Sequence, residues 1–461
     1  MAVVPSQKPD RRSELARLSH DNLLKAVLLL AWPVIIEMAM QSTVGIADVA
    51  MVGRLGPASI AAVGLCNQIS MLAMTVFAAV RTGSTVLVAR LVGANDLSGA
   101  TRAARQSLII SILIALILVA LGVLFPAAGM RLLGAEEDVV ATGIGYMRWK
   151  AISILFAIIV MTTTGILRGC GDTLTSLYAN ATINLINIGL NWIFIFGNLG
   201  MPNMGTAGAG FATMVARAVG TVIMMQVLLS GKASIKLKLL DSNRLHFPTI
   251  KRILNVGIPA AVEQLMMRGA QVFFTMIVTG LGTNMYAAHQ IAMRADSLAV
   301  MPGFGFAVAA TTLVGQNLGA RQPEVANRAG WLTLYLGVGF MAVVGVSLFT
   351  FAVPAARFFT DEPEVIVAAA SALRTMALAL PFMAVARVSA GALRGAGDVK
   401  YVMWGTGLSV WIARLGLAFI FVRLFNWGLV GAWVGMASDQ IVRAAVFGIR
   451  YWQGKWKGIS I

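Results

Sequence analysis

The sequence predicts an all-α integral membrane protein with twelve transmembrane helices, arranged as two parallel six-helix repeats around a central cavity. Two observations carry this prediction: the composition is too apolar for a soluble globule, and the second half of the chain repeats the first. Hydrophobic residues make up 58% of the 461 residues and charged residues only 12%. In water such a chain would expose a large apolar surface, so we expect it to lie in a bilayer.

Twelve apolar stretches are long enough to cross the roughly 30 Å of hydrocarbon as a helix, which takes about 20 residues. Gly and Pro residues break the chain between them. In the first half they cover residues 26–52, 58–89, 106–130, 147–166, 174–197 and 206–229. In the second half they cover residues 252–281, 285–315, 330–354, 368–392, 400–424 and 429–449. An even number of spans places both ends of the chain on the same side of the membrane.

The second half of the chain repeats the first at a fixed distance. ILRGCGD at 166–172 returns as ALRGAGD at 392–398, so that matching residue numbers differ by 392 − 166 = 226. The register continues until a slip of three residues between GTAGA at 205–209 and GLVGA at 428–432. Because each unit holds an even number of spans, the second begins on the same side as the first, which makes the units parallel repeats.

The repeated LRGxGD motif itself has a structural explanation. An Arg at a helix C-terminus interacts favourably with the helix dipole, a Gly allows the left-handed stop, and an Asp caps the next helix. We therefore interpret the motif as a marker of the duplication.

Lys and Arg residues lie mostly on one side of the predicted spans. Cytoplasmic loops accumulate these residues, so we expect both termini and the linker between the halves to be cytoplasmic. The predicted domains are an N-terminal segment 1–25, an N-lobe 26–230, a linker 231–250, a C-lobe 251–450 and a tail 451–461. The excess of Lys and Arg on the cytoplasmic side, together with their attraction to anionic lipid headgroups, explains the net charge of +17 without a nucleic-acid partner.

Polar side chains form a stripe on each of two spans. On the fifth span, four amides recur at the helical spacing i, i+4, i+7 and i+11: Asn180, Asn184, Asn187 and Asn191. On the first span, two acids and an amide recur at i, i+4 and i+11: Glu37, Gln41 and Asp48. Intramembrane carboxylates cost about 2.5–3.5 kcal/mol on insertion scales and usually face a cavity. We expect the two stripes to face each other within the N-lobe.

Such a pocket suits the exchange of a small cation. Asp48 in a low-dielectric surrounding is a reversible proton carrier, while Asn carbonyls and a Thr hydroxyl supply the oxygen ligands that hard cations need. Proton coupling and a sodium ion bound at Asp48 both stay open. The structural alternative is a network of interhelical hydrogen bonds worth about 1 kcal/mol per contact.

Four motifs in their order resemble the bacterial multidrug and toxic compound extrusion (MATE) family. They are IADVAMVGRLG at 46–56, INIGLNWIFIFG at 186–197, AAHQIA at 287–292 and the paired LRGxGD. The resemblance covers essentially residues 25–450. It implies a transporter of the bacterial inner membrane that exports drugs and toxic compounds, usually organic cations. It further implies exchange against sodium ions or protons by alternating access between the lobes.

The resemblance also assigns residues in the N-lobe. Asp48 resembles the family's first-helix aspartate, Asn187 and Asn191 its N-x-x-x-[DN] pair, and Thr213 its sixth-helix threonine. Asn191 stands where some branches have Asp, so one titratable group is missing. In the C-lobe, Glu263 resembles the seventh-helix acid of the sodium-coupled branch, but Met383 occupies the place of that branch's tenth-helix acid. A C-lobe sodium site of that type is not expected.

Further candidates for a substrate cavity lie in the second half: Glu263, Gln264, Arg268, His289 and Arg387. Arg268 aligns with Ser42 and Arg387 with Met161 across the repeat, so symmetry does not maintain these charges. For a cationic cargo we expect Arg387 to pair with Glu263 or to turn away. For an anionic lipid-linked precursor, Arg268 and Arg387 would be direct ligands, and the protein would be a flippase. We expect His289 to be a packing residue, and Asp439 and Arg443, spaced i, i+4, to neutralise each other.

Other function classes lack support in the residues. The sequence contains no GxxxxGK[ST] phosphate loop, no cluster of metal-ligand residues and no Ser/His/Asp arrangement, so we expect neither an enzyme nor an ATP-driven pump. The two cysteines, Cys66 and Cys170, lie in or beside apolar segments and predict no disulfide. We expect no cofactor besides the coupling ion, small-molecule drugs and membrane lipids as partners, and a monomer.

Overall fold

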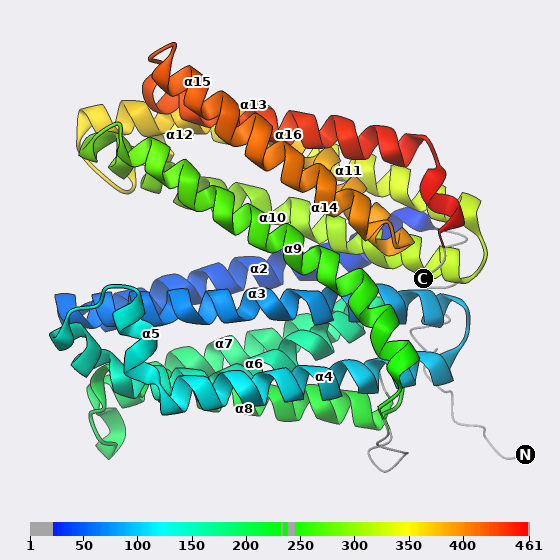
Figure 1. Ribbon diagram of the computed structural model, residues 1–461, viewed down its shortest axis with the longest axis horizontal. Helices are drawn as coiled ribbons and strands as arrows, with labels where there is room; N and C mark the ends of the chain where they lie inside the picture. Colours follow the sequence, from blue (N-terminus) through cyan, green and yellow to red (C-terminus); the bar gives the residue numbers. More distant parts are fainter. Residues whose placement is uncertain (1–21, 232–233, 238–244, 460–461) are drawn as a thin grey trace, which may run out of the picture. The chain divides into compact units, whose positions relative to one another are not determined.

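The computed structural model describes residues 22–231, 234–237 and 245–459, and these residues form helices without a strand among them (Figure 1). The predicted N-terminal segment 1–25 lies largely outside the described residues, as do residues 232–233 and 238–244 of the predicted linker 231–250. An all-α membrane protein, as the composition predicts, is therefore confirmed.

The first half contains six long helices. In chain order the helices are α2 (Leu23–Gly53), α3 (Pro57–Gly93), α4 (Leu97–Leu124), the short α5 (Pro126–Leu132), α6 (Glu137–Cys170), α7 (Thr173–Phe196), the 3₁₀ turn η1 (Asn198–Gly200) and α8 (Gly205–Ser230). Helix α4 begins where the Asp96 carboxylate accepts the Gly99 N–H at 2.8 Å, a bond that holds the pKa of this carboxyl below its usual range.

The second half repeats this order with one interruption. The elements are α9 (Phe247–Thr279), α10 (Thr283–Gly319), α11 (Pro323–Thr350), the short α12 (Ala352–Arg357), α13 (Pro363–Ala396), α14 (Val399–Leu408), η2 (Ser409–Gly416), α15 (Leu417–Arg423), α16 (Gly428–Trp452) and the 3₁₀ turn η3 (Lys455–Gly458). The interruption is η2, a π-helical segment that lies between α14 and α15 within the predicted span 400–424.

Ten helical segments of the described chain are long and apolar enough to cross a membrane. The helices α9 and α16 are also long and occupy the predicted spans 252–281 and 429–449. They fall short in hydropathy, because α9 carries Glu263 and α16 carries Asp439 and Arg443. Twelve long helical segments therefore agree with the predicted number of spans.

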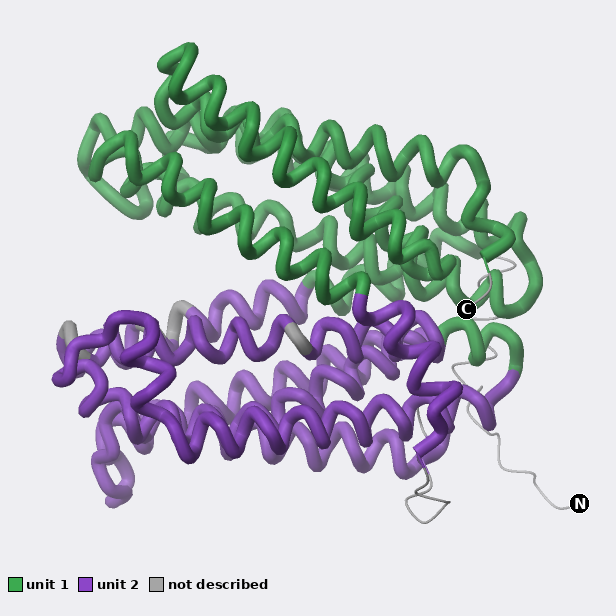
Figure 2. Tube along the Cα trace, viewed as in Figure 1, with its two compact units in different colours: residues 1–35, 89–95, 259–461 green, residues 36–88, 96–258 purple. Residues whose placement is uncertain are grey.

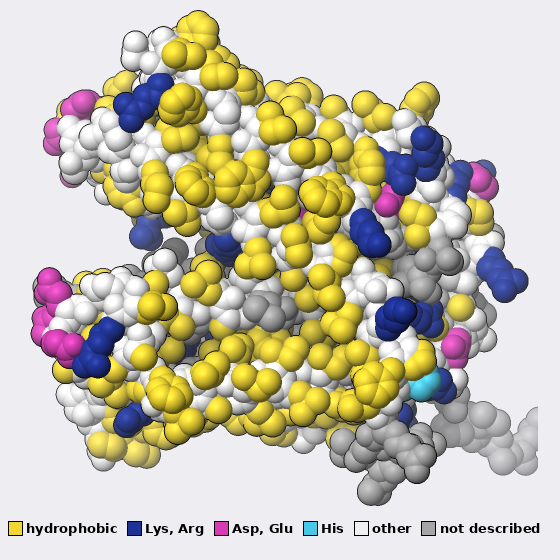
Figure 3. All heavy atoms as spheres, in the orientation of Figure 1, with side chains coloured by type: hydrophobic (Ala, Val, Ile, Leu, Met, Phe, Trp, Pro, Cys, Tyr) yellow, Lys and Arg dark blue, Asp and Glu magenta, His cyan; other side chains and the backbone are white. Residues whose placement is uncertain are grey.

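The surface fits a hydrocarbon surrounding. On the face shown in Figure 3, hydrophobic side chains cover most of the helix sides, and most Lys, Arg, Asp and Glu side chains lie toward helix ends. On α4, five large hydrophobic residues are each at least half exposed: Leu113, Leu116, Ile117, Leu121 and Leu124. In a bilayer this exposure costs nothing, because lipid tails are as apolar as the side chains.

The helix boundaries reproduce the duplication. Helices α3 and α10 are offset by 283 − 57 = 226 at their starts and by 319 − 93 = 226 at their ends. The starts of α8 and α16 differ by 428 − 205 = 223, which is the predicted slip of three residues. Matching side chains also make matching bonds: Thr85 donates to the Gly165 carbonyl at 2.9 Å, and Thr311 to the Gly391 carbonyl at 2.8 Å.

The LRGxGD motifs end α6 and α13 as predicted. Gly171 and Gly397 take the left-handed conformation with φ of 86° and 90°. Asp172 then caps α7 through the Thr175 N–H at 3.1 Å. Asp398 instead binds Arg450 at 2.8 Å, so the capping role is confirmed in the first repeat only.

The chain divides into two compact units (Figure 2). Unit 2 comprises Ile36–Val88 and Asp96–Ile258, and unit 1 comprises Met1–Ile35, Ala89–Asn95 and Pro259–Ile461. Each unit thus consists mainly of one repeat. The lobe boundaries 26–230 and 251–450, and a cavity between the lobes, stay predictions.

Candidate functional site

Asp48 lies at the centre of a polar cluster in unit 2. Its carboxylate, on α2, accepts a hydrogen bond from the Asn191 amide of α7 at 2.5 Å. In the amide orientation that satisfies both of its polar groups, Asn187 donates to the same carboxylate oxygen at 3.3 Å and accepts the Thr213 N–H of α8 at 3.3 Å. Three helices therefore bring together the four residues that the family resemblance assigns to ion coupling.

The two predicted polar stripes face each other. Three turns away from Asp48 along α2, the Glu37 carboxylate accepts the Asn180 amide of α7 at 3.1 Å. The contacts at both ends of the stripes follow from the helical spacing, because residues seven and eleven apart return to the same face. Between them, the Asn184 amide nitrogen is buried and has no hydrogen-bond partner among the described residues. Gln41 is exposed and joins neither contact.

Two cations lie close enough to Asp48 to interact with it electrostatically: the buried Lys150 of α6 and the half-buried Arg217 of α8. Lys150 lies over the Tyr146 ring, 5.5 Å from its centroid, and Arg217 donates to the Ser153 hydroxyl at 3.2 Å. The sequence analysis missed both residues as parts of this site. The sequence could have indicated Arg217, because it follows Thr213 by four residues and therefore lies on the same face of α8.

Glu37 and Glu263 have the same surroundings in the two repeats. Glu37 binds Arg168 of the first LRGxGD motif at 3.0 Å, and Glu263 binds Arg394 of the second at 2.6 Å. Asn180 bonds Glu37 and Thr406 bonds Glu263, both at 3.1 Å, and these partners again differ in number by 406 − 180 = 226. Both glutamates are buried and paired, so each ties the first helix of its repeat to the LRGxGD motif.

Of the two arrangements predicted for Arg387 with a cationic cargo, the pairing with Glu263 is wrong. Arg394 lies two turns further along α13 than Arg387, about 10 Å along the axis, and it is Arg394 that reaches the Glu263 carboxylate. The Arg387 guanidinium lies instead over the Phe304 ring, 3.9 Å from its centroid.

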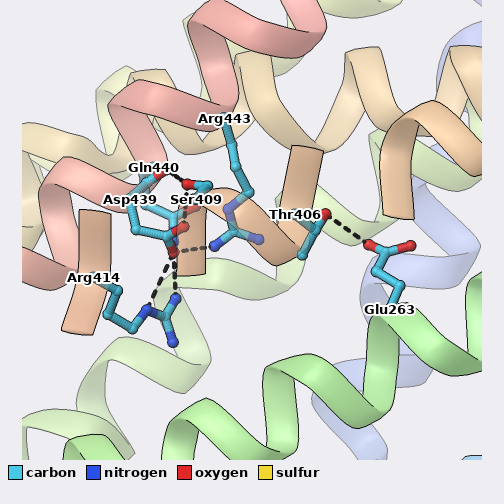
Figure 4. A network of polar contacts seen from close by, with 7 residues as sticks. All are labelled: Glu263, Thr406, Ser409, Arg414, Asp439, Gln440 and Arg443. Atoms are coloured by element: carbon cyan, nitrogen blue, oxygen red, sulfur yellow. Dashed lines mark hydrogen bonds and ion pairs between the residues drawn. The ribbon is translucent and has the colours of Figure 1, made fainter. Parts of the chain in front are cut away.

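Asp439 forms the densest charge network of the described chain (Figure 4). Its fully buried carboxylate accepts bonds from Ser409 at 2.6 Å, from Arg414 at 2.6 and 3.2 Å, from Gln440 at 3.3 Å and from Arg443. The i, i+4 pairing of Asp439 with Arg443 is thus confirmed. The π-helical segment η2 supplies Ser409 and Arg414, so its irregular turn serves to place these two partners against α16.

The remaining second-half candidates do not gather in one site. His289 is buried and accepts the Trp433 indole N–H at 3.2 Å, which fits the predicted packing role. Arg268 is exposed and Gln264 is half-buried. Within the described residues no group of three His, Cys, Asp or Glu side chains is placed to hold a metal ion. The predicted ion-coupling residues thus meet at two places in the described structure, the Asp48 cluster and the Glu37–Asn180 contact.

Comparisons with known proteins agree with this architecture. The family model MatE matches residues 33–193 and 259–420, which are corresponding parts of the two repeats. The probable multidrug resistance protein NorM of Thermotoga maritima is 33% identical over 94% of this chain and 93% of its own length.

Solved structures are similar along nearly the whole chain. A MATE structure in the bent conformation is 27% identical with a TM-score of 0.88, covering 96% of this chain and 98% of that one. An outward-facing multidrug resistance MATE family transporter of the MOP superfamily is 28% identical with a TM-score of 0.88, covering 95% and 98%.

Proposed function

The chain belongs to the MATE family of transporters, and from that premise we propose that it is a secondary active antiporter. It exports small organic compounds, mostly cationic, in exchange for protons or sodium ions. The exchange proceeds by alternating access, in which the two repeats expose the binding sites to one side of the membrane at a time.

The single observation that supports this proposal best is the Asp48 cluster. One carboxylate, two amides and a threonine from α2, α7 and α8 converge on one point. A carboxylate inside the membrane has to be neutralised before it moves between aqueous sides. A proton neutralises it by binding one oxygen, and a sodium ion does so with the help of the neighbouring amide and hydroxyl oxygens. Asp48 therefore couples the conformational change to the ion.

The cargo follows from the relatives and from the charge of the site. The relative from Thermotoga maritima is named a multidrug resistance protein. Cargo and coupling ion exchange for each other most simply when both are cations that compete for one carboxylate, because occupancy by one then excludes the other. This favours organic cations.

The alternative is a flippase for an anionic lipid-linked precursor, with Arg268 and Arg387 as ligands of the anionic group. The position of Arg387 against the Phe304 ring, near the Asp296 carboxylate, favours the antiporter. Saturable binding of a lipid diphosphate analogue that disappears in Arg268→Gln/Arg387→Gln, without binding of an organic cation to either protein, would favour the flippase.

We place the protein in the bacterial cytoplasmic membrane, as a monomer with both termini in the cytoplasm. The support is the concentration of Lys and Arg in the loops on that side.

The test is transport of a fluorescent organic cation in everted membrane vesicles. We expect accumulation that follows an imposed proton or sodium gradient in wild type and is lost in Asp48→Asn, which keeps the size of the side chain but removes its charge. Asp361→Asn, the same change at an exposed residue between α12 and α13, is the matched control and should transport normally. Gradient-dependent transport by Asp48→Asn at the wild-type rate would refute the proposed coupling site.

A further inference from the structure

Asp296 of α10 differs from the other carboxylates of the described spans. Its side chain is 7% exposed, and its Oδ1 atom is fully buried and accepts no hydrogen bond from any described residue. Glu37, Asp48, Glu263 and Asp439 each accept at least one hydrogen bond. A buried carboxylate oxygen without a donor is rare, because ionised carboxylates need compensation when they leave water.

Two arginines lie near Asp296 without satisfying this oxygen. Arg387 of α13 and Arg414 of η2 are its charged neighbours. Arg414 is committed to Asp439, which it binds through two nitrogens at 2.6 and 3.2 Å. Arg387 is stacked on the Phe304 ring, and its buried Nε has no hydrogen-bond partner among the described residues. Acid and base therefore interact electrostatically, and each has a buried polar atom without a hydrogen-bond partner among the described residues.

This arrangement suits the neutral form of the acid. A protonated carboxyl group carries no charge, so burial without a salt bridge costs it far less than it costs the anion. When the proton leaves, the anion needs a cation at once, and Arg387 is the neighbour that no carboxylate already holds. Moving the guanidinium from the Phe304 ring to Asp296 would exchange a cation–π contact for an ion pair.

The repeat indicates that this pair is not needed for folding. Position 296 corresponds to Ser70 and position 387 to Met161, since 296 − 70 = 226 and 387 − 161 = 226. In the first repeat, Ser70 donates to the carbonyl of Cys66 at 2.8 Å, one turn back along its own helix. The same helix arrangement thus forms with a serine and a methionine at these places. Both charges occur only in the second repeat, where each has the other as a neighbour.

We propose that Asp296 is a second proton-binding site, located in unit 1, and that Arg387 is the partner of its ionised form. The site has two states: a protonated Asp296 with Arg387 on Phe304, and an ionised Asp296 paired with Arg387. A proton is bound or released at the Asp296 carboxylate in each cycle. Its part in transport rests on the proposed antiport, whereas the proton binding itself does not.

The charged groups around the site are accounted for on every packed element. Arg387 faces it from α13 and Arg414 from η2. Behind Arg414, the Asp439 carboxylate of α16 is shared by Arg414 and Arg443, so these three groups together carry one net positive charge. Helices α11 and α12 also pack on α10. The charged residues of α11 are confined to its first two turns, and the single charged residue of α12 is Arg357 at its end. Arg387 is thus the neighbour whose movement changes the charge balance at Asp296.

The test is infrared spectroscopy of the purified, lipid-reconstituted protein as a function of pH. Protonated carboxylic acids have a carbonyl-stretch band that ionised carboxylates lack. We expect wild type to gain the intensity of one carboxyl group as the pH is lowered through the mildly acidic range. Asp296→Asn and Asp296→Ser, which carries the residue of the first repeat, should lack this gain. Asp361→Asn, an exposed control, should leave the band unchanged. Equal bands in wild type and in both Asp296 variants at every pH would overturn the proposal.

Arg387→Met, again the residue of the first repeat, tests the partner. Without the cation the ionised form loses its ion pair, so the band should persist to higher pH than in wild type. If the carbonyl-stretch band has the same pH dependence in wild type and in Arg387→Met, Arg387 is not the partner of the ionised Asp296.

A transport measurement then separates this inference from the proposed function. In vesicles, Asp296→Ser should move fewer protons per cargo molecule than wild type while Asp48→Asn abolishes coupled efflux. If wild type exports no organic cation at all, the proposed function fails, yet the infrared result still decides whether Asp296 holds a proton.

Discussion

Replacing Asp439 by alanine removes the carboxylate that Arg414 and Arg443 share. In the native protein this side chain is 0% exposed and is bonded by Ser409, Gln440 and both arginines. In the variant, two guanidinium groups with 6% and 9% of the residue exposed would keep their charge and lose their counter-ion. Neither can move to water without opening the packing between η2 and α16.

The expected loss of stability is about 3–5 kcal/mol, the range observed when one partner is removed from a buried ion pair. Since about 1.4 kcal/mol corresponds to a factor of ten, the unfolding equilibrium constant should rise about 10²–10⁴-fold. Because two buried arginines lose their counter-ion here rather than one, we expect a loss of stability at the upper end of this range.

The assay is equilibrium unfolding of the purified protein in mixed lipid–detergent micelles. The matched control removes the whole network with Asp439→Leu, Arg414→Met and Arg443→Leu, and it should recover most of the lost stability because no unpaired charge remains. Ser409 keeps a partner in that variant, since it also donates to the backbone carbonyl of residue 439 at 3.1 Å. Wild-type stability in Asp439→Ala would refute the view that this network is buried and paired.

Three further predictions follow from the fold. Gly391→Ala should cost about 1–3 kcal/mol of stability, because a Cβ there would collide with the Ala307 backbone carbonyl; Gly339→Ala, with open space around the Cβ, should be neutral or slightly stabilising in the same unfolding assay. Glu37→Gln should reduce gradient-dependent efflux less than Asp48→Asn does, because Glu37 is held by Arg168 in a pair that the second repeat also has; complete loss of efflux in Glu37→Gln would contradict this. Single cysteines in a cysteine-free protein should react with impermeant reagents from the cytoplasm at Ser230 and Ser242 and from outside at Asn203 and Asn284; an outside label at Ser242, which lies outside the described residues, would reverse the orientation.

The duplication was predictable from sequence because it depends on register alone. A constant offset of 226 and a slip of three near the last helices reappear in the helix boundaries of α3, α10, α8 and α16. The apposition of the polar stripes was predictable for a similar reason. Helical spacing fixes which side chains share a face, and polar faces in a membrane protein turn toward each other.

The partners of the arginines were not predictable in the same way. Arg387 and Arg394 lie on the same helix at a spacing of seven residues, so both project from nearly the same face of α13. Which of them reaches Glu263 depends on the height of α9 against α13, a tertiary quantity that the sequence pattern does not contain.

Lys150 illustrates a different limit of the sequence pattern. Lys150 lies near the start of the predicted span 147–166, and in the structure it is buried within α6, near Asp48. When a lysine lies close to the end of a predicted span, the sequence pattern does not distinguish a loop residue from a residue that lines a pocket. The sequence did not indicate Asp296 as a site. Arg294, two residues away, is exposed on another face of α10, and the charged neighbours of Asp296 come from α13 and η2, far away in the sequence.

The most direct test of Asp48 as the coupling site is ion movement driven by cargo alone. Purified protein in liposomes is given a gradient of an organic cation but no ion gradient, and the proton or sodium concentration inside is followed with a dye. Because coupling between two ligands is reciprocal, wild type should drive the ion opposite to the cargo, and Asp48→Asn should leave the ion concentration unchanged. Cargo-driven ion movement that persists in Asp48→Asn would contradict the assignment of Asp48 as the residue that exchanges the ion.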